Sequence, residues 1–569
     1  MNDDQVQALL SAARVLSEVG RAFSARSLLD NVARQAPDAL GSATLSTARR
    51  VEAELTCLGA EALIDAGRRK DAQMAWSELV AAAGRQRTPL DPAMLRLRLA
   101  LIEPPPHPPA HREGDPELAY ILGLSLPQDE TGYAMRTQAL VSAMQAQGRS
   151  VVCLTKPGFP WDRGHADAGR QDRVGDIVYH RTGEATDRPA RLPADYLAAE
   201  EKVFAALSPL RPRWVMAASN YTTAIPALFA ARRLGLPFVY EVRGFWELSR
   251  ASREPGYMDS LDYRAARDLD GAVAAQADLV FTLNSAMRDD LIGRGVDPGR
   301  IALLPNAADT EVLRPAPRDA ALARRLGLPA EVPVIGYVGS FTDYEGLDDL
   351  VAACAGLAAE RLDFRLLIVG ADPRGESRIS TRLRQMAADL GLTDRVILPG
   401  SVPLEQVAAW YSLIDIAPIP RRRFPVTELV SPLKPREAMA MGKAVVVSDL
   451  DPLAEMVRSG VTGEVFPTGD CHALARVLAR LISDPAHCRA LGDAARRDVV
   501  ANHRWSVRAE TCWRALLRVE PRLDVAERGD YEASEGRLLA DDIQHAYSDG
   551  VRHPAGSDQD GASGDRAGQ

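Results

Sequence analysis

Short apolar segments alternate with amphipathic helical patterns along most of this chain, and this alternation restricts the fold more than any other feature. The first set of predicted strands comprises residues 118–124, 150–154, 214–219, 237–242 and 277–283. Helical periodicity between them predicts helices that include residues 133–148, 221–235 and 285–295. Buried strands separated by helices indicate a parallel sheet that is covered by helices on both faces.

A second set of the same kind begins after Leu313. Its predicted strands are residues 332–339, 364–370, 395–400, 415–420 and 444–449. Its predicted helices include residues 346–360, 379–391, 404–413 and 471–484. We therefore predict an α/β protein with two doubly wound, Rossmann-like domains at residues 117–312 and 313–520. The expected ligand site lies between them, at the carboxyl ends of their strands.

The segments before and after the two α/β domains have different sequence patterns. Residues 1–102 show only helical periodicity, which predicts an all-α helical domain before the two α/β domains. Two helical pairs in it resemble tetratricopeptide hairpins, so a plain helical appendage and a surface for a protein partner both stay open. Residues 103–116 form a proline-rich linker, and residues 521–569 predict a mostly disordered acidic tail.

The composition indicates which cellular compartment and which kinds of partner to expect. The formal net charge of −9 gives no electrostatic reason to expect nucleic acid as a partner. Six cysteines without a C-x-x-C pair fit a reducing compartment. The amino-terminal segment has no signal-peptide pattern, and no apolar run approaches the roughly 20 residues of a membrane span. We expect a cytoplasmic protein, with peripheral association at the inner face of a membrane left open.

The stretch LVSPLKPREAMAMGKAVVVSD, residues 429–449, combines polar and apolar features in a way that predicts a site. Pro435 suits the first turn of a short helix and Gly442 suits its end, directly before an apolar strand. The helix amino end and Lys434 would attract a phosphate. Glu437 lies on the same face and would accept hydrogen bonds from sugar or ribose hydroxyls. In the alternative interpretation, Glu437 only complements the helix dipole and Lys434 is solvated.

Several motifs together resemble one family. They are LPNAAD (304–309), YVGSFTDYEGLDDLVAA (337–353), VILPGSVPLEQVAAWYSLIDIAPIP (396–420) and REAMAMGKAVVVSDLDPLAEMVRSGVTGEVFPTGD (436–470). With them, residues 118 to about 515 resemble a family 4 retaining glycosyltransferase of the GT-B fold, in particular its bacterial polysaccharide-type members. The resemblance implies transfer of a sugar from a nucleotide-sugar donor to a glycan or lipid-linked acceptor with retained configuration. It implies no cofactor and no metal, because the nucleotide sugar is a substrate.

The resemblance also assigns roles to residues. Glu437 matches the second glutamate of the family's Glu–seven residues–Glu motif, which binds the donor ribose. The first glutamate of that motif is replaced by Leu429, so Glu428 is the nearest candidate for its donor contact. The family's arginine and lysine for the donor diphosphate are replaced by Ser340 and Glu345.

Other groups must then neutralise the diphosphate, because the leaving nucleotide develops negative charge. We expect Lys434, the Gly339–Ser340 backbone and Asn306 to bind the donor, with Arg243 acting beside Glu437 in catalysis. Arg421, Arg422 and Arg423 form a further basic run. In the alternative interpretations, Arg243 pairs with Glu241 or Glu247, the three arginines are solvated, and Glu345 complements a helix dipole.

The acceptor is expected on the first α/β domain. The loop after the first strand leads into a helix at Gly132, and Gly132, Tyr133 and Arg136 are the predicted acceptor contacts. Two rival hypotheses accompany the transferase. One is a catalytically degenerate GT-B protein that acts as a binding or assembly partner; the other is a nucleotide-sugar epimerase on the same plan.

Overall fold

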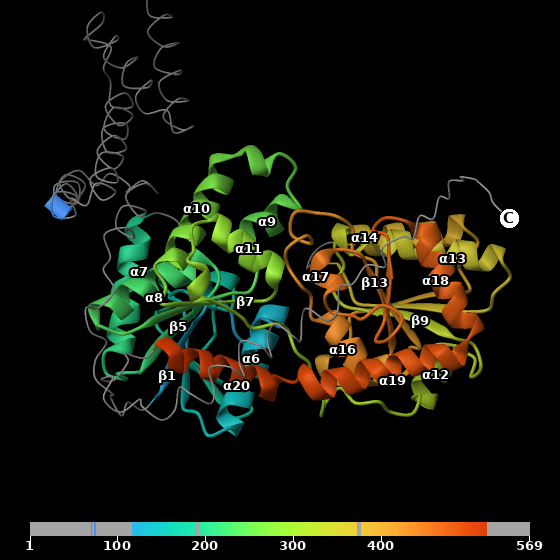
Figure 1. Cartoon of the computed structure of the whole chain (residues 1–569), viewed down its shortest axis with the longest axis horizontal. Coiled ribbons are helices and arrows are strands. Elements are labelled where there is room, and N and C mark those ends of the chain that lie inside the picture. The colour runs from blue at the N-terminus through green and yellow to red at the C-terminus, as the bar shows by residue number, and fades with distance from the viewer. Residues whose placement is uncertain (1–69, 71–72, 75–115, 188–192, 373–376, 520–569) are drawn as a thin grey trace, which may run out of the picture. The chain divides into compact units, whose positions relative to one another are not determined.

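The computed structural model of the chain describes residues 70, 73–74, 116–187, 193–372 and 377–519. The predicted helical domain, the proline-rich linker and the acidic tail therefore lie almost entirely outside the described residues. The described residues form two α/β lobes. The first lobe contains β1 to β8 with α6 to α11, and the second contains β9 to β14 with α12 to α19 (Figure 1).

Within the described residues, the first lobe is built on an eight-stranded sheet in the order β3-β4-β2-β1-β5-β6-β7-β8. Its strands are β1 (Leu118–Leu122), β2 (Val151–Thr155), β3 (Gln171–Val174), β4 (Ile177–Arg181), β5 (Trp214–Ala218), β6 (Phe238–Val242), β7 (Leu279–Thr282) and β8 (Ile301–Leu303). All neighbours pair in parallel except β3 and β4, which form an antiparallel pair at one edge.

Helices cover both faces of this sheet. They are α6 (Gly132–Ala146), α7 (Pro193–Leu207), α8 (Tyr221–Arg233), α9 (Trp246–Ala251), α10 (Leu261–Ala275) and α11 (Ser285–Gly293). The alternation of β1 shows the two faces directly. Ala119 and Ile121 lie in the core formed with α7, α8 and α10, whereas Leu118, Tyr120 and Leu122 lie in the core formed with α6. A strand buried on both faces has no polar side to display, which explains its continuous apolar sequence.

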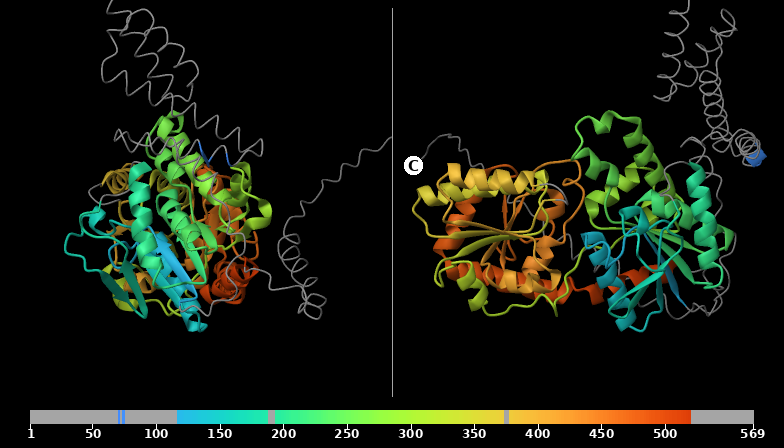
Figure 2. Two further views of the ribbon diagram at one scale, coloured as in Figure 1. Left: turned by 90° about the vertical axis from the view of Figure 1, so that its left-hand side faces the viewer. Right: turned by 180° about the vertical axis from the view of Figure 1, so that it is seen from behind.

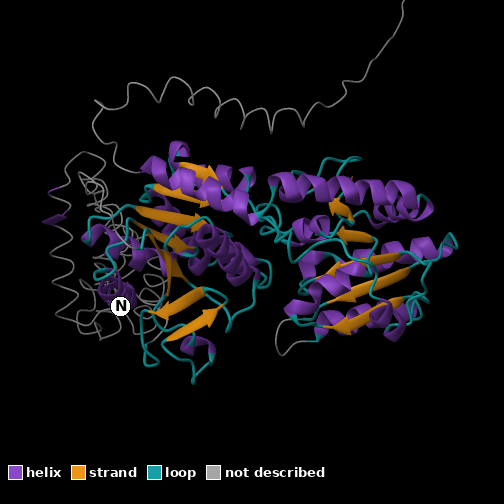
Figure 3. Ribbon diagram, turned by 90° about the horizontal axis from the view of Figure 1, so that it is seen from below, coloured by secondary structure: helices purple, strands orange, loops and turns teal. Residues whose placement is uncertain are grey.

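The second lobe, over the described residues, contains a six-stranded sheet in the order β11-β10-β9-β12-β13-β14, with parallel pairing throughout. Its strands are β9 (Val334–Val338), β10 (Arg365–Val369), β11 (Val396–Gly400), β12 (Ile416–Ile419), β13 (Ala444–Ser448) and β14 (Glu464–Phe466). Figure 3 shows the strands of each sheet lying between helices.

The helices of the second lobe divide between the two faces of its sheet. They are α12 (Ala320–Arg325), α13 (Leu347–Ala359), α14 (Arg378–Asp389), α15 (Val407–Ser412), α16 (Lys434–Ala440), α17 (Asp451–Ala454), α18 (Cys471–Ser483) and α19 (Pro485–Asn502). One core joins the sheet to α13, α14 and α18, and the other joins it to α15, α16 and α19. Local sequence sets several helix starts; for example, the Asp470 side chain accepts a hydrogen bond from the backbone N–H of Ala473 at the start of α18.

The last described helix, α20 (Trp505–Leu516), returns to the first lobe. Trp505, Cys512 and Trp513 are buried in the same core as β1 and α6, and α20 lies beside α6 in the views of Figures 1 and 2. The turn between α19 and α20 is fixed by a backbone hydrogen bond from Ala308 N–H to His503 O. The chain therefore links the two lobes at residues 304–310 and again at residue 503.

The predicted fold class is confirmed for its two Rossmann-like units, and each predicted apolar strand overlaps an observed one. The sequence prediction did not include the edge strands β3, β8 and β14, nor β4, which lies beside β3. It also did not include the helices α7, α9, α10, α12, α17 and α19. Within the described ranges, no helix combines the length and the hydropathy that a membrane crossing requires.

Candidate donor-binding site

Lys434 lies against the carboxyl end of β9. Gly339, directly after β9, has φ 151°, and a Cβ atom built on it would lie 2.1 Å from Lys434 Cε and 3.2 Å from Lys434 Nζ. The lysine side chain therefore occupies the space that only a glycine leaves free. Ser340, the next residue, is exposed. The predicted donor contacts Gly339, Ser340 and Lys434 are thus brought together at the end of one strand.

A buried carboxylate holds this lysine. Glu345 is 2% exposed, and its Oε1 accepts hydrogen bonds from Lys434 Nζ at 3.0 Å and from Arg421 Nη2 at 2.8 Å. Burial raises the pKa of Glu345, but Arg421 and Lys434 outweigh burial and lower the pKa to about 2. Two cations and one anion leave one net positive charge at the end of β9. The dipole interpretation of Glu345 missed both of these partners.

The arginine run at 421–423 is not a uniformly solvated loop. Arg421 is buried on Glu345 and also donates to Val430 O. Arg422 forms two hydrogen bonds of 2.7 Å to the carboxylate of Asp349 on α13. Arg423 is exposed and pairs with Glu428 at 2.5 Å. The predicted donor contact of Glu428 stays a prediction, since this carboxylate binds Arg423 in the structure.

Glu437 lies in the first turn of α16 and is half-buried. Burial raises the pKa of its carboxyl group, and the charge of Lys434 opposes that rise. Burial raises the pKa of Tyr411, and the negative charge of Glu437 raises it further. Among the described residues, no hydrogen bond or ion pair occupies the Glu437 carboxylate, so it keeps its acceptor capacity for a ligand hydroxyl.

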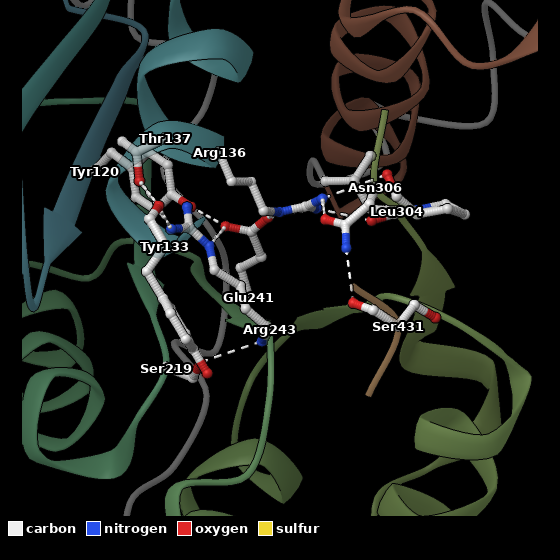
Figure 4. Close-up of polar contacts among 11 residues, drawn as sticks. Tyr120, Tyr133, Arg136, Thr137, Ser219, Glu241, Arg243, Leu304, Asn306 and Ser431 are labelled. Carbon is white, nitrogen blue, oxygen red and sulfur yellow. Dashed lines mark hydrogen bonds and ion pairs between the residues drawn. The ribbon is translucent and has the colours of Figure 1, made fainter. Parts of the chain in front are cut away.

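The first lobe contains a buried ionic network centred on Glu241, at the end of β6 (Figure 4). One carboxylate oxygen accepts hydrogen bonds from Arg136 Nε at 3.0 Å and Nη2 at 2.8 Å. The other accepts from Arg243 Nε at 2.7 Å and from the hydroxyl of Tyr120. Burial raises the pKa of Glu241, and Arg243 opposes that rise. A fully buried carboxylate is tolerated here because two guanidinium groups saturate it.

Arg243 is oriented into this network. Its Nη1 donates to Tyr133 O at 2.9 Å and to Thr137 Oγ1 at 2.8 Å, and its Nη2 contacts the Tyr120 hydroxyl. Every nitrogen of the guanidinium group thus has a partner inside the first lobe. The alternative interpretation, a pair with Glu241, is what the structure shows, and the predicted catalytic role of Arg243 stays a prediction.

The predicted acceptor residues lie at the start of α6. Gly132 packs against Leu433 of the second lobe, and the Tyr133 hydroxyl lies against Gly244. Arg136 is buried, and besides Glu241 it donates to Leu304 O at 2.7 Å and to Asn306 Oδ1 at 3.0 Å. Contacts of these residues with an acceptor stay predictions.

Asn306 and Asn284 connect the first lobe to residues 429–431 of the second. Asn306 Nδ2 donates to Ser431 O at 2.9 Å (Figure 4). Asn284 Nδ2 donates to Leu429 O and to Ser431 Oγ, each at 2.7 Å. The segment between β12 and α16 is therefore bound to both lobes, through Arg421 and Arg422 on its own lobe and through these two asparagines on the other.

Sequence reasoning did not assign site roles to Glu345 and Glu241, the two carboxylates that organise these networks. Glu345 stands where the resemblance leads one to expect a lysine, and a lysine stands at position 434. A negative charge at 345 together with a positive charge at 434 was the feature of the sequence that could have indicated this pair. In the part of the chain that the structure describes, no group of three or more His, Cys, Asp or Glu side chains is placed to hold a metal ion.

The first sheet is parallel except for its β3–β4 pair, and the second is parallel throughout. The protein is thus an α/β protein with two Rossmann-like domains, and a lysine lies at the carboxyl end of a strand in the second. Two family models match parts of the chain. Residues 319–498 match the family model "Glycosyl transferases group 1" and residues 131–307 match "Glycosyl transferase 4-like domain". These two regions of the chain are therefore similar to glycosyltransferases, which agrees with the resemblance that the motifs indicate.

One similar curated protein is a D-inositol 3-phosphate glycosyltransferase of Acidothermus cellulolyticus, 31% identical over 264 residues. The match covers 45% of this chain and 56% of the relative, so the chain spans about half the length of the curated relatives it matches.

Two solved structures have the same fold. The sucrose-phosphate synthase of Thermosynechococcus elongatus is 21% identical with a TM-score of 0.57, and the match covers 71% of this chain and 99% of that chain. Anabaena Alr3699/HepE, solved in complex with UDP, is 17% identical with a TM-score of 0.57, and the match covers 71% of this chain and all of the other, 100%.

Proposed function

We propose that this protein is a glycosyltransferase that moves a sugar from a nucleotide-sugar donor to a glycan or lipid-linked acceptor, with retention of configuration. The observation that supports it most is the placement of Lys434 on Gly339, at the carboxyl end of β9. Ligands of doubly wound sheets bind at that edge. The matches to the two glycosyltransferase family models and the solved neighbours with UDP and UDP-glucose support the same donor class.

In the proposed reaction the donor diphosphate contacts Lys434 and the backbone of Gly339 and Ser340. Glu437, three residues after Lys434 on the same helix, accepts hydrogen bonds from ribose hydroxyls. As the bond between the sugar and the diphosphate breaks, negative charge develops on the leaving phosphate, and the fixed ammonium stabilises it. The acceptor hydroxyl attacks the anomeric carbon from the face the diphosphate leaves, and its proton passes to the leaving phosphate.

The first experiment identifies the donor. Melting temperatures of the purified protein are recorded with UDP-, GDP- and ADP-sugars, because a ligand that binds the folded state raises the melting temperature by mass action. UDP-glucose is the first donor to test, since one neighbour was solved with it. No rise with any nucleotide sugar would contradict the proposed donor class.

The second experiment tests the site. Lys434→Ala should weaken binding of the identified donor by roughly 10- to 100-fold, because a hydrogen bond to a charged group contributes about 1.5–3 kcal/mol. Glu437→Ala should weaken it comparably. Lys202→Ala is the matched control, since Lys202 pairs with Asp187 in the first lobe and is far from β9 in the chain. Unchanged donor binding in both site variants would refute the assignment.

The finer claims have their own measurements. Proton NMR of the product gives its anomeric configuration, and an inverted product would contradict retention. The proposed scheme assigns the leaving charge to Lys434 and calls for no metal, so EDTA should leave the transfer rate unchanged. A protein that binds the donor without transferring sugar to any offered glycan or lipid-linked saccharide would favour the degenerate alternative.

A further inference from the structure

The backbone at Glu345 is fixed by a close contact with the segment that follows β12. It ends a single 3-10 turn, Asp343–Glu345, and Gly346 follows with φ 69°. A Cβ atom on Gly346 would lie 1.9 Å from Pro420 O, so the backbone that follows β12 rests directly on this glycine. The start of the Glu345 side chain is thereby fixed against the segment that contains Arg421.

The other end of the Glu345 side chain is fixed by its two cations. Arg421 and Lys434 both bind Oε1, and Lys434 Nζ also lies 5.4 Å from the centre of the Tyr337 ring. Lys434 is therefore confined by Gly339, Tyr337 and Glu345 on three sides. A lysine has several freely rotating bonds, so such confinement removes conformational freedom before a ligand arrives.

The two cations differ in how much they can offer a ligand. The Arg421 side chain is 10% exposed and the Lys434 side chain is 16% exposed. Arg421 also donates a hydrogen bond to Val430 O, whereas among the described residues Lys434 Nζ has only Glu345 as a hydrogen-bond partner. An ammonium group has three donors, so two of them stay available in the direction that is not blocked.

We propose that Glu345 is a positioning residue for nucleotide binding. It orients Lys434 toward the donor diphosphate, and Arg421 neutralises the negative charge of Glu345. This inference rests on the proposed function, and it explains how an acidic residue can stand where the family resemblance implies a lysine. The cation is supplied from position 434, and the carboxylate at 345 fixes its direction.

The hypothesis predicts the opposite sign from simple electrostatics. Removing a negative charge beside a phosphate site should strengthen anion binding if Glu345 acts only through its charge. If Glu345 positions Lys434, Glu345→Gln should weaken binding of UDP, GDP or ADP, whichever binds the wild type most tightly in calorimetry. We expect the dissociation constant to rise about tenfold.

A double-mutant cycle shows whether the effect passes through the lysine. In the Lys434→Met background, Glu345→Gln should change the dissociation constant by less than about twofold, because the group that Glu345 orients is gone. Asp349→Asn is the matched control: it removes a neighbouring carboxylate that pairs with Arg422, and nucleotide affinity should stay within about twofold of wild type.

Glu345→Asp covers the case in which the glutamine variant does not fold. It keeps the charge that compensates Arg421 but shortens the side chain, so binding should weaken severalfold while the melting temperature changes little. Equal or tighter nucleotide binding in a folded Glu345→Gln or Glu345→Asp variant overturns the positioning role, as does a loss that is the same with and without Lys434. Absence of nucleotide binding by the wild type would instead refute the proposed function.

Discussion

The pH dependence of stability in the first lobe should be set in large part by one buried carboxyl group, Asp270 on α10. Its Oδ1 accepts hydrogen bonds from the Tyr240 hydroxyl at 2.5 Å and from the Tyr221 N–H at 3.0 Å. Its Oδ2 is buried, and no hydrogen bond among the described residues reaches it. Burial and the nearby charge of Glu247 raise the pKa of Asp270 from 3.8 to about 7, although Arg294 opposes them.

The direction in which the free energy of unfolding changes with pH follows from proton linkage. Between these two pKa values the folded state binds a proton at Asp270 and the unfolded state does not, so stability falls as pH rises. A proton difference of one changes the free energy of unfolding by about 1.4 kcal/mol per pH unit. Between pH 5 and pH 8, the folded state begins to ionise only near the upper end, so the contribution of Asp270 declines by about 3 kcal/mol.

Asp270→Asn removes this titration while keeping an oxygen for the two donors. Urea denaturation of both proteins at pH 5 and pH 8 gives the free energies of unfolding. The wild type should lose about 3 kcal/mol more than the variant between the two pH values. Asp262→Asn is the control, since Asp262 lies on the same helix with a side chain that is 78% exposed. Parallel losses in wild type and Asp270→Asn would refute the argument.

Three further outcomes follow from the contacts. Glu241→Gln should lower the free energy of unfolding by about 3–5 kcal/mol, because it leaves two buried guanidinium groups without a counter-charge; urea denaturation measures it, and a loss below about 1 kcal/mol would contradict it. Gly346→Ala should cost about 2 kcal/mol or more, since its Cβ would overlap Pro420 O at a positive φ; an unchanged melting temperature would count against the close approach. Asn284→Ala should speed proteolysis within residues 421–433, because it removes two hydrogen bonds from that segment; the same cleavage rate as wild type would argue that these bonds do not restrain it.

The pattern of the sequence predicted the central strands well and the edge strands poorly. β1, β5 and β6 are buried along their whole length, so their apolar runs are continuous. β3 lies at the edge of the first sheet, and its residues alternate between exposed and half-buried. A short polar segment such as QDRV contains no signal that separates it from a loop, and only the neighbouring β4 makes it a strand.

For the site, the sequence predicted individual residues but not how their charged groups pair. Lys434, Gly339 and Glu437 were predicted as donor contacts from local spacing and from the family motifs. The partners of Glu345 are 76 and 89 positions away along the chain. The residues next to an arginine or a lysine in the sequence do not show whether its side chain is solvated or buried against a carboxylate. No local pattern therefore distinguishes the two cases.

The amino-acid sequence alone thus determined the two α/β units, and it predicted the strand end at which a nucleotide sugar is expected to bind. Hydrophobic periodicity and glycine placement act over a few residues, and they are visible in any short window. The tertiary structure decided which charges neutralise one another: Arg243 and Arg136 on Glu241, and Arg421 and Lys434 on Glu345. Burial sets the free energy of each such pair, and burial depends on how the strands and helices pack.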